Sequence, residues 1–122
     1  MPAVTAYQML IDGQWVDASD GARYDSVDPA TGDVWASMPE ATSDDVDRAV
    51  RAAEAAGISG RWASMTPTER GKCLRRLGDL LADASETLGR IETRDTGKMF
   101  KETRWQAKYI AEFFHFYAGC AD

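Results

Sequence analysis

The final segment of the chain, residues 101–122, is the feature that most restricts how the molecule can fold. It reads "KETRWQAKYIAEFFHFYAGCAD", and we expect a helix over about residues 101–119. Its large aromatic side chains cover far more than one helical stripe: Tyr109, Phe113, Phe114, Phe116 and Tyr117. A large apolar side chain left in water forfeits roughly 1.5–3 kcal/mol, so the cluster approaches a cost on the order of 10 kcal/mol, as large as the net stability of an ordinary domain. We therefore expect further polypeptide to pack on this helix and the chain to be a protein cut short.

The length and charge of the chain exclude several classes of protein. Its 122 residues suffice for one modest domain, and 44% hydrophobic with 28% charged residues is a globular composition. The net charge of −6 disfavours nucleic acids and anionic membranes as partners, because both attract basic faces. No apolar run reaches the roughly 20 residues of a membrane span, and no signal-peptide pattern is present. Cys73 and Cys120 are unpatterned, which suits reduced thiols, so we expect a soluble cytoplasmic protein.

The first third of the chain predicts two short β-hairpins, over about residues 8–39. Asp12-Gly13 stands between two runs of strand formers, and Asp-Gly supplies the positive backbone angles of a tight hairpin turn. The stretch "RYDSVDPATGDVWASM" has the same plan, with Pro29 and Gly32 in the chain reversal.

The period of the apolar residues then becomes helical. We expect a helix over about residues 43–57, with Thr42 or Ser43 capping its start and Gly57 closing its end. Acidic residues fill its first turn, which suits the positive end of the helix dipole.

A longer helix is expected over about residues 67–95. Thr66 and Glu69 form a capping box, with Pro67 at the first helical position. Gly97 can end this helix. Its apolar side chains alternate three and four residues apart on one stripe: Leu74, Leu77, Leu81, Ala84, Leu88 and Ile91. The chain therefore predicts an α+β fragment in which two short hairpins are followed by three helices.

Asp95-Thr96-Gly97 matches the signature triplet of the aspartic proteases. In those enzymes the triplet lies on a tight loop in an all-β frame, where two carboxylates share a proton. Here it follows one helical segment and precedes another, so the triplet is interpreted as the turn between two helices.

Other catalytic patterns are not recognisable in the sequence. His115 is the one histidine and is interpreted as a packing or surface residue. Cys73 lies beside the leucine stripe and is interpreted as a small core residue, and Cys120 has no visible base beside it. We name no catalytic and no cofactor-binding residue in this chain.

Five segments of the sequence nevertheless occur in an order that resembles one protein family. They are "LIDGQWVDASDG", "VDPATGDVWASMPEA", "DDVDRAVRAAEAA", "RWASMTPTERGKCLRRLGDLLADASETLGRIETRDTGK" and the closing "FYAGCAD". This order resembles the amino-terminal segment of the NAD(P)-dependent aldehyde dehydrogenases. The resemblance extends from about residue 9 to the end of the chain. It implies that residues 1–122 form the start of the cofactor-binding domain of an α/β aldehyde dehydrogenase fold.

The resemblance also implies a reaction. The family oxidises an aldehyde to a carboxylic acid: a cysteine thiolate attacks the carbonyl, hydride passes to NAD or NADP, and water activated by a glutamate releases the acid. In the family these residues lie downstream of the matched segment, and the chain has no asparagine for the family's oxyanion hole. We expect the chain to be inactive alone, to pair with the remainder of the polypeptide, and to form a homo-oligomer when complete.

Two pairs of residues can be carried over from the family. The first is a monovalent cation site between the backbone carbonyl of Val27 and the carboxylate of Asp95; the alternative is that Asp95 caps the next helix or pairs with Lys98. The second is Trp105 and Tyr109, one turn apart on the face that lines the aldehyde entry funnel in the family; the alternative is core packing.

A second class of function stays open beside the enzyme. The aromatic helix could belong to a non-enzymatic interaction module that docks onto another chain. The sequence also departs from the family pattern, since Asp28 replaces the usual Asn of the turn, Met99 stands where Pro is common, and Cys120 replaces a Trp.

Overall fold

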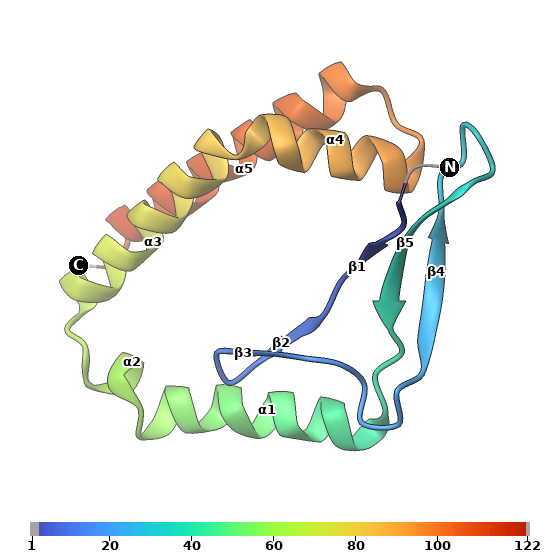
Figure 1. The fold of residues 1–122 in the computed structure, drawn as a ribbon. Helices are drawn as coiled ribbons and strands as arrows, with labels where there is room; N and C mark the ends of the chain where they lie inside the picture. Colours follow the sequence, from blue (N-terminus) through green and yellow to red (C-terminus); the bar gives the residue numbers. More distant parts are fainter. Residues whose placement is uncertain (1–2, 122) are drawn as a thin grey trace. The chain divides into compact units, whose positions relative to one another are not determined.

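The computed structural model describes residues 3–121, which form two compact units that meet in sequence between Ala63 and Ser64. The strands are β1 (Thr5–Ala6), β2 (Met9–Ile11), β3 (Gln14–Val16), β4 (Arg23–Val27) and β5 (Val34–Pro39). The helices are α1 (Ser43–Ile58), α2 (Arg61–Ser64), α3 (Pro67–Asp83), α4 (Ser85–Thr96) and α5 (Phe100–Gly119) (Figure 1). The α+β class predicted from the sequence is confirmed.

The first hairpin joins β2 and β3 and has the predicted turn. Asp12 and Gly13 both have positive φ, at 51° and 74°, as a tight hairpin turn requires. Asp12 adopts this conformation without being a glycine, because a short polar side chain tolerates the left-handed region.

The second hairpin belongs to a three-stranded sheet with the order β1-β5-β4. β4 and β5 are antiparallel, and the Asp28 carboxylate holds their connection by accepting the Ala30 amide at 2.9 Å. A register shift at Ser26/Val27 leaves the buried Trp35 as the extra residue of β5, and its indole N–H donates to the Ser26 hydroxyl at 2.9 Å. β1 pairs parallel with β5. The sequence did not predict this strand, because two residues are too few to show a period.

The Arg23 guanidinium ties this sheet to the end of the first hairpin. It donates to the carbonyl oxygens of Tyr7 at 2.7 Å and Ser37 at 2.8 Å, and to the Asp17 carboxylate at 2.8 Å. The planar fork of an arginine suits such simultaneous contacts.

α1 begins with a capping box, as predicted. The Thr42 hydroxyl accepts from the Asp45 amide, and the Asp45 carboxylate accepts from the Thr42 amide at 3.1 Å. The same carboxylate accepts the Ser19 amide at 3.0 Å, so it fastens the loop before β4 to the start of α1. At its other end the helix passes through Gly57, predicted as its terminus, and is capped at Ser59.

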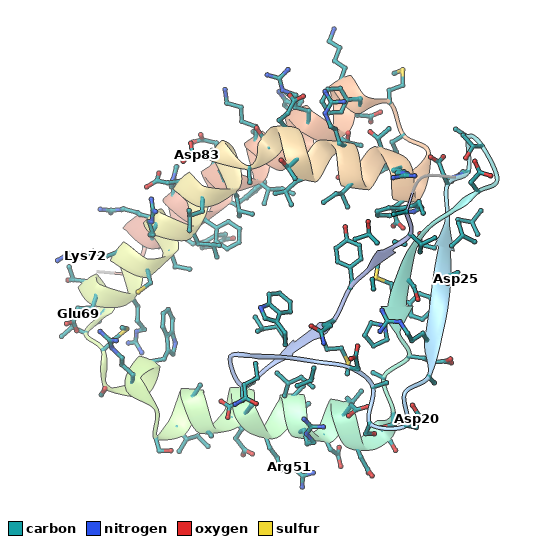
Figure 2. All side chains as sticks on the ribbon, in the orientation of Figure 1. Asp20, Asp25, Arg51, Glu69, Lys72 and Asp83 are labelled. Carbon is teal, nitrogen blue, oxygen red and sulfur yellow. The ribbon has the colours of Figure 1, made fainter. Side chains whose placement is uncertain are left out.

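The helix expected over 67–95 is divided in two at Ala84. Ala84 has φ −82° and ψ 1°, which ends the regular helical path of α3 before α4 begins. Both halves pack on α5, and the bend allows each half to keep its contact. The predicted capping box of Thr66 and Glu69 is present, and Gly97 ends α4 in the left-handed conformation. Lys72 and Asp83 project outward from α3 (Figure 2).

Glycines and alanines allow the closest approach between α5 and its two partner helices. A Cβ at Gly71 would lie 2.8 Å from the Ala118 carbonyl oxygen, and a Cβ at Gly89 only 2.7 Å from the Arg104 Cα. These contacts run in opposite sequence directions, so α5 is antiparallel to α3 and α4. We call this contact the glycine seam; its buried members are Gly71, Gly78, Ser85, Gly89, Thr103, Ala107, Ala111 and Ala118.

The seam changes the interpretation of the leucine stripe and of one cysteine. Leu77 and Ile91, expected on a buried stripe, are exposed. Cys73, expected in the core, is exposed as well. At about 100° per residue, Cys73 lies roughly 200° around the helix from Gly71, which faces α5, and therefore points away from the seam.

Candidate functional site

The most unusual surface of the described chain is the face of α5 opposite the glycine seam. Trp105, Tyr109 and Phe113 follow one another at four-residue spacing, so one turn separates each ring from the next. The rings of Trp105 and Tyr109 stack at 4.9 Å with an interplanar angle of 9°, and Tyr109 meets Phe113 edge-on at 5.4 Å. Their exposed fractions are 60%, 48% and 52%.

Two further rings extend this surface toward the end of α5. Phe116 and Tyr117 pack edge-to-face at 5.3 Å, and 66% of Phe116 is exposed. We call the whole surface the ring face; its members are Trp105, Tyr109, Phe113, Phe116 and Tyr117. Each large apolar ring left in water forfeits roughly 1.5–3 kcal/mol of burial free energy. The five half-exposed rings therefore form an apolar surface that the described chain does not cover.

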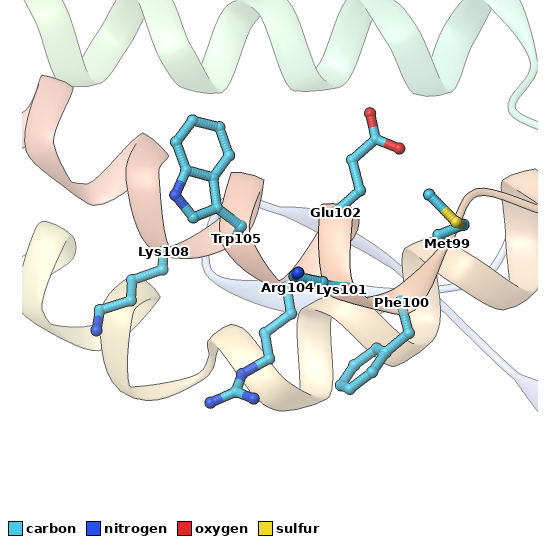
Figure 3. A pocket seen from close by; sticks show the side chains of 7 residues that line it. All are labelled: Met99, Phe100, Lys101, Glu102, Arg104, Trp105 and Lys108. Atoms are coloured by element: carbon cyan, nitrogen blue, oxygen red, sulfur yellow. The ribbon is translucent and has the colours of Figure 1, made fainter.

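Two grooves lie along α5. The first, of about 660 Å³, is at the amino end of the helix (Figure 3) and is lined by Met99, Phe100, Lys101, Glu102, Arg104, Trp105 and Lys108. Phe100 and Arg104 project to one side of the helix, and Glu102 and Trp105 to the other. Its charged lining is mainly basic.

The second groove has a different character. It is lined by Tyr109, Glu112, Phe113, Phe116 and Tyr117, so that a single carboxylate stands among four rings. We call it the aromatic groove. All of its lining residues come from α5.

Charged side chains fix the amino end of α5 against α4. Glu86 binds Arg90 at 2.7 Å and Arg104 at 3.3 Å through its two carboxylate oxygens. Arg90 also lies over the Phe100 ring, 4.6 Å from its centroid. The first groove therefore has one rigid wall.

Two ionisable groups have shifted pKa values, and both serve structure. The amide of Ser19, followed by the amide and hydroxyl of Thr42, lowers the pKa of Asp45 to about 2. Glu92 accepts a hydrogen bond from the Lys98 ammonium at 2.9 Å, and this bond together with the carboxylate charge raises the pKa of Lys98. Neither group points to acid–base chemistry.

The structure places the predicted cation ligands on separate elements. Val27 ends β4 in the first unit, and Asp95 lies exposed in the last turn of α4 in the second. Both residues offer oxygen atoms, the donors that a hard cation prefers. The triplet containing Asp95 ends a helix, so the structure excludes the protease interpretation.

The remaining candidate groups are scattered. His115 Nε2 lies 3.2 Å from the Asp79 carboxylate and joins α5 to α3, and Cys73 and Cys120 are free, exposed thiols. Within residues 3–121, no group of three or more His, Cys, Asp or Glu side chains is placed to hold a metal ion. None of the helices in that range is long and apolar enough to cross a membrane.

Sequence comparison decides the family. The sequence profile of the aldehyde dehydrogenase family matches residues 15–122, which is most of the chain. The chain belongs to the aldehyde dehydrogenase family. The resemblance predicted from the five ordered motifs is therefore confirmed, and the chain corresponds to an amino-terminal portion of an aldehyde dehydrogenase.

Curated relatives are four times longer than this chain. The chain is 46% identical over 116 residues to (Z)-2-((N-methylformamido)methylene)-5-hydroxybutyrolactone dehydrogenase of Acinetobacter baylyi, covering 95% of this chain and 23% of that protein. It is 38% identical over 120 residues to aldehyde dehydrogenase family 2 member B4, mitochondrial, of Arabidopsis thaliana, covering 98% and 22%. The chain thus spans slightly less than a quarter of the relatives it matches.

Solved aldehyde dehydrogenases share the fold of this segment. The NAD-dependent aldehyde dehydrogenase of Sinorhizobium meliloti superposes with a TM-score of 0.91 at 36% identity, over 96% of this chain and 24% of that one. Betaine aldehyde dehydrogenase of Staphylococcus aureus, described in complex with NAD+, gives a TM-score of 0.89 at 36% identity, over 94% and 23%. The comparisons support aldehyde oxidation at the level of the family and give no support to a non-enzymatic interaction module.

Proposed function

We propose that the chain forms the amino-terminal part, residues 1–122, of the cofactor-binding domain of an NAD(P)-dependent aldehyde dehydrogenase, which oxidises an aldehyde to a carboxylic acid. The observation that carries the proposal is the family match over residues 15–122, supported by the TM-score of 0.91 to a solved NAD-dependent aldehyde dehydrogenase. Two matched structures are described with NAD, which supports a nicotinamide cofactor.

The chain supplies scaffold, and the remaining polypeptide supplies the reacting groups. Within the described residues, Cys73 and Cys120 are free, exposed thiols, and no hydrogen bond joins either thiol to a basic side chain. The sequence also lacks asparagine. Bound NAD or NADP would accept hydride from the aldehyde carbon when the complete enzyme works. This chain contributes neither the nucleophile nor the cofactor contacts in our proposal, and its share is the rigid helical wall built by α3, α4 and α5.

Production of NADH tests the proposal directly. We define the chimera as residues 1–122 of this chain followed by the remaining three-quarters of the Acinetobacter baylyi relative, which is 46% identical over the matched part. We expect aldehyde-dependent NADH formation by the chimera and none by residues 1–122 alone. Turnover by residues 1–122 alone would contradict the claim that the remaining polypeptide supplies the reacting groups. A folded chimera without turnover would contradict the proposed function.

Trp105 and Tyr109 are proposed to line the path by which the aldehyde enters. Their parallel stacking at 4.9 Å presents a flat, rigid apolar wall of the kind that guides an apolar substrate. In the chimera we expect Trp105→Ala to raise KM for an aromatic aldehyde by roughly tenfold while kcat changes little. Trp105→Phe keeps a ring and serves as the matched control. A lower melting temperature with unchanged KM would favour the packing alternative.

The carbonyl of Val27 and the carboxylate of Asp95 are proposed to bind a monovalent cation. Asp95 is exposed in the described chain, and a hard cation would balance its carboxylate where further polypeptide covers it in the complete enzyme. A crystal of the chimera soaked in rubidium should show anomalous density beside Asp95, and Asp95→Asn should remove it. Absence of density in the unsubstituted protein leaves helix capping or pairing with Lys98 as the role of Asp95.

The complete enzyme is further proposed to be a cytoplasmic homo-oligomer. The exposed apolar surface on both units supports further association, since side chains such as Trp15 in the first unit are also exposed. Sedimentation of the chimera should give more than one copy per particle, whereas a monomer would contradict the assembly.

A further inference from the structure

The dipeptide Asp-Gly occurs twice in the first unit, and the structure gives the two copies different surroundings. Asp12-Gly13 forms the turn between β2 and β3, and Asp20-Gly21 lies in the loop before β4. All four residues are exposed, and the two glycines have nearly the same positive φ, 74° and 75°. The two sites therefore match in sequence, in exposure and in the conformation of the glycine, and they differ in hydrogen bonding and in the conformation of the aspartate.

An aspartate followed by glycine can rearrange without any reactant except water. The glycine nitrogen attacks the protonated side-chain carboxyl carbon, since no Cβ obstructs its approach. A C–N bond forms, and the amide proton and the carboxyl hydroxyl leave as water, which closes a succinimide ring. Water then opens the ring again. Opening at the side-chain carbonyl restores aspartate, and opening at the main-chain carbonyl gives isoaspartate, in which the main chain continues through the side chain.

Hydrogen bonds oppose this reaction at the second copy. The Gly21 amide, which holds the attacking nitrogen, donates to the Ala18 carbonyl at 2.9 Å. The Asp20 carboxylate accepts the Ala22 amide, also at 2.9 Å. The residue before the site, Ser19, is fastened to the start of α1. Ring closure at Asp20-Gly21 therefore has to break two hydrogen bonds in a loop that is held from both sides.

The first copy has no such protection. Within residues 3–121, neither the Asp12 carboxylate nor the Gly13 amide has a hydrogen-bond partner. Asp12 has a φ of 51°, a left-handed conformation that is unfavourable for a residue with a Cβ. The flanking strands pair only with each other in a two-stranded sheet, which opens more easily than a larger one.

We propose that Asp12-Gly13 is a site of spontaneous isoaspartate formation in the folded chain, whereas the fold protects Asp20-Gly21. Isoaspartate carries a carboxylate on its Cα. Protein isoaspartyl methyltransferases esterify this group: a carboxylate oxygen takes the methyl group of S-adenosylmethionine, whose sulfonium becomes a thioether. The partner implied by the site is an enzyme of this class. All the reacting groups lie in the first hairpin, so the proposal is independent of the proposed function.

The modification would change the first hairpin. Isoaspartate adds one atom to the backbone of a two-residue turn, and the length of that turn sets the register of the strands. The present register places Ile11 opposite Gln14 and Leu10 opposite Trp15. Ile11 is buried, so a shift in the register would disturb the packing of β2. We expect the modified hairpin to lose amide-exchange protection while the helices of the second unit keep theirs.

Peptide mapping of the aged protein tests the proposal. Residues 1–122 are kept for several weeks at neutral pH, folded or in concentrated urea, and electron-transfer fragmentation then distinguishes isoaspartate from aspartate at each site. In the folded chain, isoaspartate at residue 12 should exceed that at residue 20 at least about fivefold, because two hydrogen bonds protect the second site. In urea the two sites should react at similar rates, since the fold no longer separates them.

Two matched variants identify the source of the modification in a second measurement. The aged, folded protein is treated with isoaspartyl methyltransferase and labelled S-adenosylmethionine. Asp12→Gly should remove most of the label, and glycine suits the positive φ of that turn. Asp20→Gly, in the other copy, should leave the label unchanged.

Three results would overturn the proposal. The first is an equal or larger amount of isoaspartate at residue 20 than at residue 12 in the folded chain. The second is isoaspartate at residue 12 in urea but not in the folded chain, which would show that the hairpin protects its turn. The third is the absence of isoaspartate at residue 12 under both conditions.

Discussion

The two faces of α5 differ in the size of their side chains and in their burial. On one face small residues, Ala107 and Ala111 among them, let α3 and α4 approach until backbone meets backbone. On the other face Trp105, Tyr109 and Phe116 project into solvent. The first face is complete within the described chain, and the second requires further protein. A helix with one packed face and a second face of large exposed rings is expected in the interior of a larger molecule than the chain that carries it.

The largest effect is expected from filling the glycine seam. A Cβ at Gly89 would lie 2.7 Å from the Cα and 2.8 Å from the nitrogen of Arg104, and these backbone atoms can move only if α4 and α5 separate. We expect Gly89→Val to lower the free energy of unfolding of the chain by about 3 kcal/mol. Urea titration followed by circular dichroism measures the loss.

Gly57→Ala is the control for that experiment. Gly57 lies in α1, and a Cβ added there would have no heavy atom within 4 Å, so alanine should stabilise the helix by about 0.5–1 kcal/mol. A small effect of Gly89→Val would mean that the helices pack less closely than the structure shows.

A smaller loss is expected at Thr103, a seam residue whose side chain forms hydrogen bonds. Thr103 is fully buried, and its hydroxyl donates to the Gly89 carbonyl at 2.9 Å and accepts from the Thr93 hydroxyl at 2.8 Å. Thr103→Val keeps the shape but leaves both partners without this bond, at a cost of about 1–2 kcal/mol. Thr103→Ser retains the hydroxyl and should recover most of the hydrogen-bond contribution in the same urea titration. Equal losses in the two variants would assign the effect to packing.

The sequence predicts the parts of this molecule that depend on local chemistry. Asp12-Gly13 predicts the first turn, Thr66 with Glu69 predicts a helix start, and Gly97 predicts a helix end, because each signal acts within a few residues. The number of aromatic residues on the last helix likewise predicts that some rings are exposed in this chain, because the prediction requires only the helical period of the sequence.

The glycine seam and the division at Ala84 could not be predicted in the same way. Gly71 and Gly78 look like defects in a leucine-rich helix until their partners on α5, Ala118 and Ala111, are known, and the sequence does not say which face meets α5. A signal was nevertheless present, because Gly71, Gly78 and Ser85 are seven residues apart and mark one face of small residues. The docking of Asp45 on Ser19 is also invisible locally, since 26 residues separate the two.

Acid should release the Asp45 contact of the first unit before it affects the buried face of α5. The Ser19 and Thr42 amides lower the pKa of Asp45 from its ordinary 3.8 to about 2, so its contribution to stability is complete above about pH 4 and is lost as the pH falls through about 2. The buried side chains of the glycine seam include no carboxylate. Amide exchange should therefore show Ser19 losing protection below about pH 4 before Thr103 does. Asp45→Asn should remove this pH dependence at Ser19; simultaneous loss at both amides would contradict the assignment.

The smallest effect is expected on the ring face of the chain by itself. Phe116 is 66% exposed and touches Tyr117 edge-on, so little burial is lost when the ring is removed. Phenylalanine and serine have similar helix propensities. We expect Phe116→Ser to change the free energy of unfolding of residues 1–122 by less than about 0.5 kcal/mol. Ala111→Leu, on the packed face of the same helix, should cost several times more because its site is filled. A loss of about 2 kcal/mol or more for Phe116→Ser would show the ring to be buried in the free chain. The two faces of α5 would then no longer differ, and the chain would have no need of the polypeptide that its relatives possess.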